Sequence, residues 1–399
     1  MKILLIDSAS QLGGAQRSLL ELAVALQARG IQVHAAVPAG PLAEGLLAAG
    51  VPVRRIPAVR LHRSLHPRML LEAARFVSAL FALVRAVRAV RPEIIHANGL
   101  TPALLAVMFR NRRPVVWHVR DLNMRFSAVR YLARRVACIV GISEPVAEHL
   151  TEIDPTFQLR KVRLIRNGID TGHFCPGDRA AARRMFQLPV DAPLVGMAAH
   201  LVPWKRHRFF LTLAAAIHQA RGDVQFVIAG RDLFRDHPKL RAGLEEKIAA
   251  SGLSGSLTWV RDLDDLAPLL PALDVLVHPA ANEPFGRVLC EAMASGIPVV
   301  AATSAGPGCV VPNGVAGHLV HPGDADAFAR QALQLINQPD AARRMGAAGR
   351  QHVLDKFDVK RTAAELHTLF DKLLAQQARD ERRRTEDSSR RLRRDADDD

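Results

Sequence analysis

The second half of the chain contains two short, mainly apolar runs with a helical segment between them. The runs lie at 274–278 and 299–302, and a polar loop that carries Glu283 follows the first. Gly286 allows a tight turn into the helix, and Gly296 suits the left-handed position that ends it. The second run is apolar throughout, which is typical of a strand covered on both faces. A strand–helix–strand unit of this kind predicts a parallel sheet and an α/β fold.

Both halves of the chain repeat this alternation of strands and helices. In the first half we expect strands at 2–6, 32–37, 53–56, 93–96, 114–118 and 136–140, with helices that end near 29 and span 41–49 and 70–90. In the second half we expect strands at 194–199, 224–229, 257–260, 274–278, 299–302 and 318–320, with helices at 208–220, 238–250, 263–270, 285–295, 324–337, 341–354 and 360–374. Short strands separated by helices pair in parallel through right-handed crossovers. The sequence therefore predicts two doubly wound, Rossmann-like domains that face one another across a cleft.

The length of the chain agrees with two domains. It has 399 residues, too many for one ordinary core, and 49% of them are apolar. We expect an N-terminal domain at 1–172 and a C-terminal domain at 173–357. A helix at 358–376 is expected to pack back toward the first domain. The tail at 377–399 is charged and almost without apolar residues, which predicts disorder.

The net charge of +15 is concentrated in the first half of the chain. Residues 1–175 hold 24 Lys and Arg against 11 Asp and Glu, a balance of +13, so the remainder carries only +2. Such a basic half predicts an anionic partner: phosphate groups, an anionic membrane surface or an acidic glycan. The low aromatic content and the lack of a recognisable nucleic-acid-binding motif argue against nucleic acid.

Three features bear on location. The four cysteines show no C-x-x-C spacing, which argues against a zinc site or a disulfide framework and fits a reducing cytosol. No apolar run fits a signal peptide or a membrane span. The helix expected at 70–90 carries Arg68, Arg75, Arg85 and Arg88 off its apolar face. We expect this apolar face to pack on the sheet and the arginines to be solvated. A basic amphipathic helix can also lie on a membrane, and the exposed arginines would then contact anionic lipid. We expect a cytoplasmic protein, peripheral on the inner face of the plasma membrane.

The loop and helix after the strand at 274–278 have the features of an anion site. Glu283 is expected at the carboxyl edge of the strand, and Glu291 about a turn and a half into the helix. Free amides and the positive end of the helix dipole favour a phosphate there. Two nearby carboxylates can accept hydrogen bonds from sugar hydroxyls. Spacing alone also fits two solvated glutamates in an ordinary strand–turn–helix unit.

The amino-acid sequence of this stretch contains a more specific motif. The run from Glu283 to Ala301 resembles the E-x7-E motif and the Ala-Met-Ala-x-Gly-x-Pro-Val-Val-Ala sequence of family 4 glycosyltransferases, which are retaining enzymes of the GT-B fold. The resemblance covers nearly the whole folded chain and is strongest from 194 to 324. It implies retaining transfer of a sugar from a UDP- or GDP-type nucleotide sugar to a glycan or lipid-linked acceptor. We connect this activity with cell-envelope polysaccharide biosynthesis.

The resemblance also implies roles for individual residues. Glu283 would bind hydroxyls of the donor sugar as a catalytic residue, and Glu291 would hold the ribose hydroxyls. His118, at the end of a strand, would contact the transferred sugar, and His96 is a weaker candidate. Gly14, in the pair that opens the first helix, would face the donor diphosphate. Backbone groups that would reach the sugar and phosphate belong to Phe285, Gly286, Val288 and Leu289.

The loop after the strand at 194–199 matches the family's Gly-Arg-Leu-x-Pro-x-Lys-Gly sequence only in part. Lys205 matches the diphosphate-binding Lys, but His200 stands where Arg is usual, and Arg206 follows where Gly is usual. A His supplies a full positive charge only when protonated, so Arg206 or Arg208 are candidates to compensate. Because Lys205, helix amides and Gly14 would neutralise the diphosphate, we expect neither a metal nor another cofactor.

The turn at 167–170 and Cys309 also bear on function, and other functions stay open. Asn167-Gly168-Ile169-Asp170 resembles the family's turn at the domain junction, and Cys309 stands where many relatives carry Glu. The departures at His200 and Cys309 leave open a non-catalytic nucleotide-sugar-binding partner of another transferase. A nucleotide-sugar epimerase or a phosphorylase on the same fold also stays open. The donor base, the sugar and the acceptor cannot be assigned from the sequence.

Overall fold

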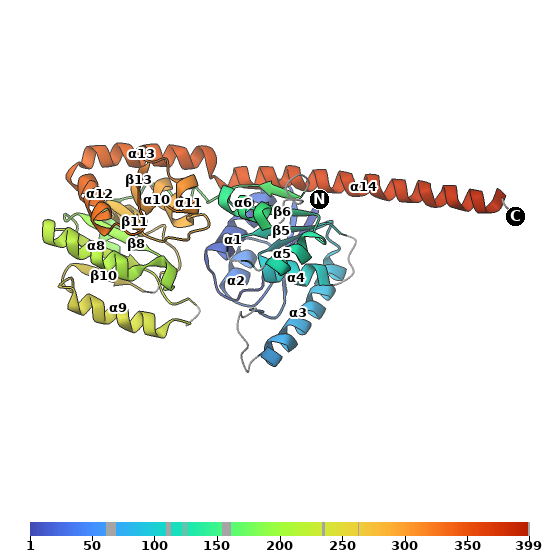
Figure 1. Cartoon of the computed structure of the whole chain (residues 1–399), viewed down its shortest axis with the longest axis horizontal. Helices are drawn as coiled ribbons and strands as arrows, with labels where there is room; N and C mark the ends of the chain where they lie inside the picture. Colours follow the sequence, from blue (N-terminus) through green and yellow to red (C-terminus); the bar gives the residue numbers. More distant parts are fainter. Residues whose placement is uncertain are drawn as a thin grey trace.

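The computed structural model describes residues 1–60, 69–108, 113–122, 124, 126–153, 161–233, 236–261 and 263–397. Arg68 lies outside these residues. The molecule has two lobes, each built on one parallel sheet with helices on both faces (Figure 1). The first sheet has seven strands and the second has six.

The first lobe follows the predicted alternation closely. Its elements are β1 (Lys2–Ile6), α1 (Gly14–Gln27), β2 (Gln32–Val37), α2 (Pro41–Ala48), β3 (Val53–Arg55), α3 (Met69–Val90), β4 (Ile94–Asn98), α4 (Leu100–Met108), β5 (Val115–Val119), α5 (Phe126–Ala133), β6 (Cys138–Gly141), α6 (Glu144–Ile153) and β7 (Val162–Leu164). The strand β7 at the edge of the sheet was not predicted, because only three residues form it and two of them are exposed.

The second lobe repeats the alternation. Its elements are α7 (Arg179–Met185), β8 (Leu194–Ala198), η2 (Pro203–Lys205), α8 (His207–Ala220), β9 (Gln225–Ala229), α9 (Pro238–Ala250), β10 (Leu257–Val260), η3 (Leu270–Ala272), β11 (Val275–His278), α10 (Arg287–Ala294), β12 (Val299–Ala302), α11 (Ala305–Val310), β13 (Gly317–Val320), α12 (Ala325–Asn337) and α13 (Pro339–Lys356). The helix predicted at 263–270 is wrong, since turns and η3 take its place. Pro268 and Pro271 supply no amide donor and clash with the preceding turn of a helix.

In each sheet the chain runs outward from a central strand first in one direction and then in the other. The strand orders are β3-β2-β1-β4-β5-β6-β7 and β10-β9-β8-β11-β12-β13, and the pairings are parallel. The winding therefore reverses between β1 and β4 and between β8 and β11. Loops that leave the carboxyl ends of two such strands diverge, and ligands bind in the crevice between them. The predicted α/β fold with two doubly wound, Rossmann-like domains is confirmed.

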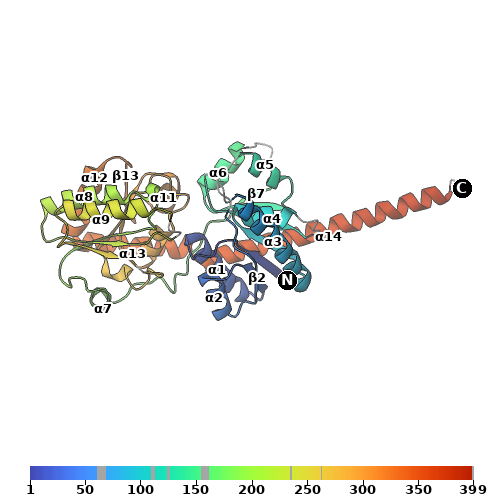
Figure 2. The same ribbon diagram turned by 90° about the horizontal axis from the view of Figure 1, so that it is seen from below.

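Helices bury both faces of each sheet. In the first lobe, α1, α2 and the start of the last helix cover one face, and α3 to α6 cover the other; Figure 2 shows α1 and α2 on the side opposite α5 and α6. In the second lobe, α8, α9 and α12 cover one face, and α10, α11 and α13 cover the other. The register of the strands places apolar residues beside one another. Ile3 of β1, for example, lies opposite both Val33 of β2 and Ile94 of β4.

The last helix, α14 (Val359–Asp397), returns the chain to the first lobe. Leu366 and Phe370 are buried there with Leu19 of α1, and Ile169 forms a β-bridge with Asp358 where the chain crosses back. Beyond the lobe the helix projects outward (Figure 1), and its described side chains are all exposed from 378 to 386. The sequence predicted disorder at 377–399, whereas the structure continues the helix to Asp397. Arg, Gln, Glu and Ala are good helix formers, which a criterion based on low apolar content overlooks.

Within the described residues, no helix combines the length and the hydropathy that crossing a bilayer requires.

Candidate active site

The switch points of the two sheets meet where the lobes touch. Ser143, two residues after β6, donates a hydrogen bond from Oγ to the carbonyl of Pro284 (2.7 Å), in the loop between β11 and α10. Arg17 of α1 lies 3.6 Å from the carboxylate of Asp265 in the second lobe. Each of these residues lies on the carboxyl-end side of its sheet. The carboxyl ends of both sheets therefore face one another, as ligand binding at a switch point requires.

Glu283 lies between the carboxyl end of β11 and the start of α10. Its side chain is buried and forms an ion pair with Lys205. Glu283 Oε2 also lies 3.1 Å from Nε2 of His278, the last residue of β11, and Oε1 accepts a hydrogen bond from the Gly286 amide (3.2 Å). Burial opposes ionisation, but the charge of Lys205 and the hydrogen bond from His278 outweigh it and hold the pKa of Glu283 well below its usual range. The structure thus brings the predicted Glu283 and Lys205 together as a fixed charge pair.

The tautomer of His278 follows from this arrangement. Burial lowers the pKa of His278, so the ring is neutral at pH 7. An ionised carboxylate only accepts hydrogen bonds, so Nε2 of His278 carries the proton and donates to Glu283. The sequence analysis overlooked His278, although its place at the end of a strand five residues before Glu283 was a usable signal.

His200 lies after β8, in the same loop as Lys205. Burial lowers the pKa of His200 to about 4, helped by nearby positive charges. Those charges are Lys205, Arg231 and Arg17. At pH 7 His200 is therefore a neutral ring, and the positive charge at this point comes from its three neighbours.

Arg206 and Arg208, the candidates to replace the missing Arg, both point elsewhere. Arg206 has φ +61° and donates to the carbonyl of Pro322, with its guanidinium over the ring of Phe209. Arg208 approaches Gly243 of α9, since a Cβ on that glycine would lie 2.4 Å from Nη2. Each of them thus has another partner here, and compensation for His200 by either one stays a prediction. Arg231 and Arg17, which do not belong to the motif, add positive charge near His200, and each is paired with a carboxylate, Arg231 with Asp264 and Arg17 with Asp265.

Glu291 lies in the second turn of α10 and is buried. Its Oε1 lies 2.6 Å from Nε of Arg287, four residues earlier in the same helix. Burial raises the pKa of Glu291, while the charge of Arg287 opposes the rise. Glu291 therefore faces the mouth of α10, as predicted, but it is already paired with a cation that the sequence analysis did not single out.

The starts of α1 and α10 lie beside one another. A Cβ on Gly14 would lie 3.9 Å from Cδ of Arg287, and a Cβ on Gly13 would lie 3.5 Å from Leu233 of the second lobe. These glycines keep the start of α1 free of side chains at the point where the other lobe approaches. Gly286 has φ +93°, which bends the chain sharply into α10. Both helices thus direct their positive ends toward the same junction.

The backbone amides predicted to reach the donor are partly engaged in the structure. The amide of Gly286 donates to Glu283, and that of Leu289 donates to the carbonyl of Gly286 (2.9 Å). Phe285 is buried with its ring against Phe357, while Val288 is half-buried.

His118 lies in a separate polar cluster inside the first lobe. Its Nδ1 is 3.1 Å from Nε2 of His96 and 3.5 Å from Nη2 of Arg120. Burial lowers the pKa of His96 to about 3 and that of His118 well below its usual range, so both rings are neutral at pH 7. Nε2 of His118 is buried and makes no hydrogen bond. The structure pairs the two predicted histidines with one another, and it gives His118 no direct bond to Glu283 or Lys205.

A chain of hydrogen bonds leads from this cluster to the junction of the lobes. Asn98 Nδ2 donates to Asp7 (2.6 Å) and Asn98 Oδ1 accepts from Arg120 Nε (2.8 Å). Arg120 Nη1 donates to Asn167 Oδ1 (2.7 Å), and Asn167 Nδ2 donates to Ser18 Oγ of α1 (2.9 Å). Asn167 belongs to the turn singled out in the sequence, but its part in this chain was not predicted, because its two side-chain partners, Arg120 and Ser18, come from distant segments.

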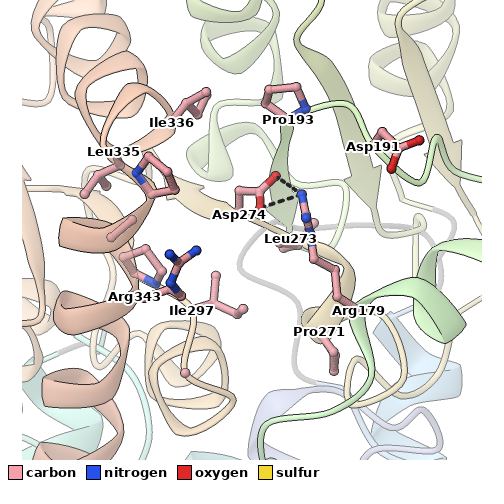
Figure 3. A pocket seen from close by; sticks show the side chains of 14 residues that line it. Arg179, Asp191, Pro193, Pro271, Leu273, Asp274, Ile297, Leu335, Ile336 and Arg343 are labelled. Carbon is pink, nitrogen blue, oxygen red and sulfur yellow. Dashed lines mark hydrogen bonds and ion pairs between the residues drawn. The ribbon is translucent and has the colours of Figure 1, made fainter.

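A hollow of about 360 Å³ lies at the amino ends of the strands of the second sheet, opposite to the ends that carry Lys205 and Glu283 (Figure 3). Pro193, Asp274 and Pro298, which line it, each precede a strand, and Arg179 pairs with Asp274 at 2.9 Å. Ligands of doubly wound sheets bind at the carboxyl ends of the strands, so this hollow at the amino ends is not the expected ligand site. Among the described residues, no group of three or more His, Cys, Asp or Glu is placed to hold a metal ion.

Comparison with known proteins matches both lobes to glycosyltransferase families. A family model described as "Glycosyltransferase Family 4" matches residues 12–173, and one described as "Glycosyl transferases group 1" matches residues 178–352. The alpha-maltose-1-phosphate synthase of Mycobacterium tuberculosis is 31% identical over 301 residues, which cover 71% of this chain and 74% of the relative. The D-inositol 3-phosphate glycosyltransferase of Salinispora tropica is 33% identical over 244 residues, which cover 56% of this chain and 48% of the relative.

Solved structures agree on the fold. The Anabaena protein Alr3699/HepE, crystallised in complex with UDP-glucose, superimposes with a TM-score of 0.79 at 23% sequence identity, and the match covers 93% of this chain and 100% of that one. The sucrose-phosphate synthase of Thermosynechococcus elongatus gives a TM-score of 0.76 at 22% identity, with coverage of 94% and 99%.

The buried neutral histidines predict a pH dependence of stability. His96, His118, His200, His207 and His278 all have lowered pKa values, with burial as the largest cause. Unfolding returns each ring to a pKa of about 6.5, so the unfolded state takes up protons below that pH and the folded state does not. We expect the free energy of unfolding to be greatest above pH 6.5 and to fall as the pH decreases toward 4. Thermal unfolding at pH 7.5, 6.5 and 5.5 measures it, and His96→Gln should give a shallower dependence. An unfolding temperature that does not change between pH 7.5 and 5.5 would contradict this assignment.

Proposed function

The chain belongs to the family 4 glycosyltransferases, and on this premise we propose that it transfers a sugar with retention from a nucleoside diphosphate sugar to a glycan or glycolipid acceptor. The observation that carries the proposal is the Glu283–Lys205 pair, whose two residues follow the two strands at the switch point of the second sheet. A role in building cell-envelope polysaccharide is part of the same proposal.

The positive charges around His200 support a diphosphate donor. Lys205, Arg231 and Arg17 surround this neutral ring, and the starts of α1 and α10 lie beside one another. Preorganised cations and helix ends stabilise the charge that develops on a leaving diphosphate. The UDP-glucose complex of the structurally similar Anabaena protein also supports a nucleotide sugar. In our proposal these groups replace a metal ion.

The ion pair between Lys205 and Glu283 suggests how the donor is received. When the diphosphate binds, Lys205 turns to the phosphate oxygens and leaves Glu283 free to accept hydrogen bonds from sugar hydroxyls. His278 keeps the carboxylate in place during this exchange, because its bond to Oε2 does not depend on Lys205. Glu291, in the helix that follows Glu283, accepts hydrogen bonds from the ribose hydroxyls of the donor.

The transfer itself needs little from protein groups beyond this charge arrangement. The bond between the anomeric carbon and the phosphate oxygen breaks, and the acceptor hydroxyl attacks from the same face. The departing phosphate takes the proton of that hydroxyl, so proton and charge balance without a protein nucleophile. We also propose that His118, whose Nε2 makes no hydrogen bond in the first lobe, contacts a hydroxyl of the transferred sugar.

The exposed half of α3 supports a membrane-bound acceptor. Ala79, Leu83 and Val87 of this helix are buried against the sheet, whereas Leu71 and Phe81 are 51% and 68% exposed. The N-terminal turns project from the first lobe (Figure 1). Exposed arginines share this helix, and an apolar face flanked by arginines binds anionic lipid surfaces. We therefore include peripheral attachment to an anionic membrane in the proposal.

Replacing Glu283 by Gln tests the catalytic assignment. The change keeps the size of the side chain and removes its charge, so we expect turnover of the nucleotide sugar to fall by about 100-fold or more, the scale for losing one preorganised charged contact. Because Lys205 loses its buried counter-ion, some loss of stability is expected, and thermal unfolding checks that the variant is folded at the assay temperature. Glu245→Gln, on the surface of α9, makes the same chemical change away from the site and should keep full activity. If Glu283→Gln turns over the nucleotide sugar at the wild-type rate, the site is misassigned. If the wild type and Glu283→Gln both bind the donor and neither turns it over, a non-catalytic binding role is favoured.

Flotation with lipid vesicles tests the membrane proposal. The protein should float with vesicles that contain phosphatidylglycerol, less with pure phosphatidylcholine, and less at high salt. The double variant Leu71→Ser with Phe81→Ser should lose most of this binding. Met185→Ser, on an equally exposed apolar residue of α7, should keep it. Equal flotation of the double variant and the wild type would exclude α3 as the contact.

A further inference from the structure

Arg287 connects the two lobes through three buried contacts. It is the first residue of α10 in the second lobe, and its guanidinium is only 10% exposed. Nη2 donates to Glu21 and Nη1 donates to Ser18 Oγ (3.0 Å), both on α1 of the first lobe, while Nε lies 2.6 Å from Glu291. One side chain thus joins the helix that carries the ribose carboxylate to the helix that opens with Gly14.

The residues that receive Arg287 in the first lobe are themselves held rigidly. Glu21 uses its other oxygen to accept a hydrogen bond from the amide of Asp170, at the junction of the lobes (3.2 Å). Ser18 accepts from Asn167 and so ends the chain of hydrogen bonds that begins at Asp7. Arg287 therefore contacts a fixed surface of the first lobe, and its position reports the separation of the lobes.

The guanidinium suits this position because of its geometry. Its planar fork presents N–H groups in three directions, which a lysine ammonium on a flexible stem cannot match. The cluster contains two buried carboxylates, Glu21 and Glu291, for one guanidinium. Loss of Arg287 would leave both carboxylates without a cationic partner, and loss of Glu21 would leave Arg287 with Glu291 and the neutral Ser18.

We propose that Arg287 is a positioning residue that couples closure of the two lobes to the orientation of Glu291. With the lobes together, Glu21 and Ser18 hold the guanidinium, which in turn holds Glu291 Oε1 and leaves Oε2 for the ligand. With the lobes apart, Arg287 loses its two partners on α1, and Glu291 is no longer fixed. The identification of the ligand as a nucleotide rests on the function proposed above, whereas the coupling to lobe separation does not.

Glu21→Gln is the most informative change. It leaves the contact between Arg287 and Glu291 intact and removes the charge only on the side of the first lobe. We expect the protein without ligand to show a larger radius of gyration in small-angle X-ray scattering. Its affinity for UDP should fall by about tenfold or more, the factor for one buried charge-assisted hydrogen bond. Arg287→Lys should give a similar loss, since a lysine cannot hold all three partners.

Asp223→Asn is the matched control. It also neutralises one carboxylate of an Arg pair, but this pair with Arg221 lies on the surface within the second lobe. The control should scatter and bind UDP as the wild type does, and thermal unfolding should show that all variants are folded.

The outcomes separate the two proposals. A folded Glu21→Gln protein with the radius of gyration and UDP affinity of the wild type would overturn the role of Arg287. Wild-type behaviour of Arg287→Lys would also contradict it, because a simple pair within α10 would be preserved by lysine. If the wild type binds none of UDP, GDP and ADP, the proposed donor class fails, while the scattering of the ligand-free variants still decides whether Arg287 holds the lobes together.

Discussion

The reversal of winding in each parallel sheet is the constraint on which the site depends. Two neighbouring strands whose connections diverge leave a crevice at their carboxyl ends, and this molecule has one such crevice in each lobe. The glycines that open α1 follow one of the strands at the first switch point, and the loops of Lys205 and Glu283 follow the two strands at the second. Because the carboxyl ends face each other, residues that are hundreds of positions apart in the sequence become neighbours.

Buried charge determines how these neighbours are arranged. A carboxylate out of contact with water needs a partner, and Glu283 has Lys205 and His278 while Glu291 has Arg287. In the proposed function Lys205 has a second role, since this cation turns from Glu283 to the phosphates of the donor. The neutral state of His200 fits the same principle, because burial and the nearby positive charges of Lys205, Arg231 and Arg17 all disfavour a further charge on this ring.

The sequence predicted the strands well because a strand covered on both faces is a short apolar run bounded by turn residues. It also singled out Glu283, from a long specific motif, and Lys205, from a loop that matches only in part, and the structure pairs their side chains. It did not predict the contact of Arg287 with Glu21, which joins positions 266 residues apart, because no local pattern records such a pair. The positive charges near His200 were missed for a related reason, because besides Lys205 they come from α1 and from the loop after β9.

The most direct test of this account is the thermal unfolding of the purified protein with a panel of UDP-, GDP- and ADP-sugars. A ligand at one hundred times its dissociation constant stabilises the folded state by about 2.7 kcal/mol. The account predicts that sugars on one nucleotide base raise the unfolding temperature and that Glu291→Ala abolishes the rise. No rise with any nucleotide sugar, or a rise that persists in Glu291→Ala, would contradict the placement of a nucleotide-sugar site between the two lobes.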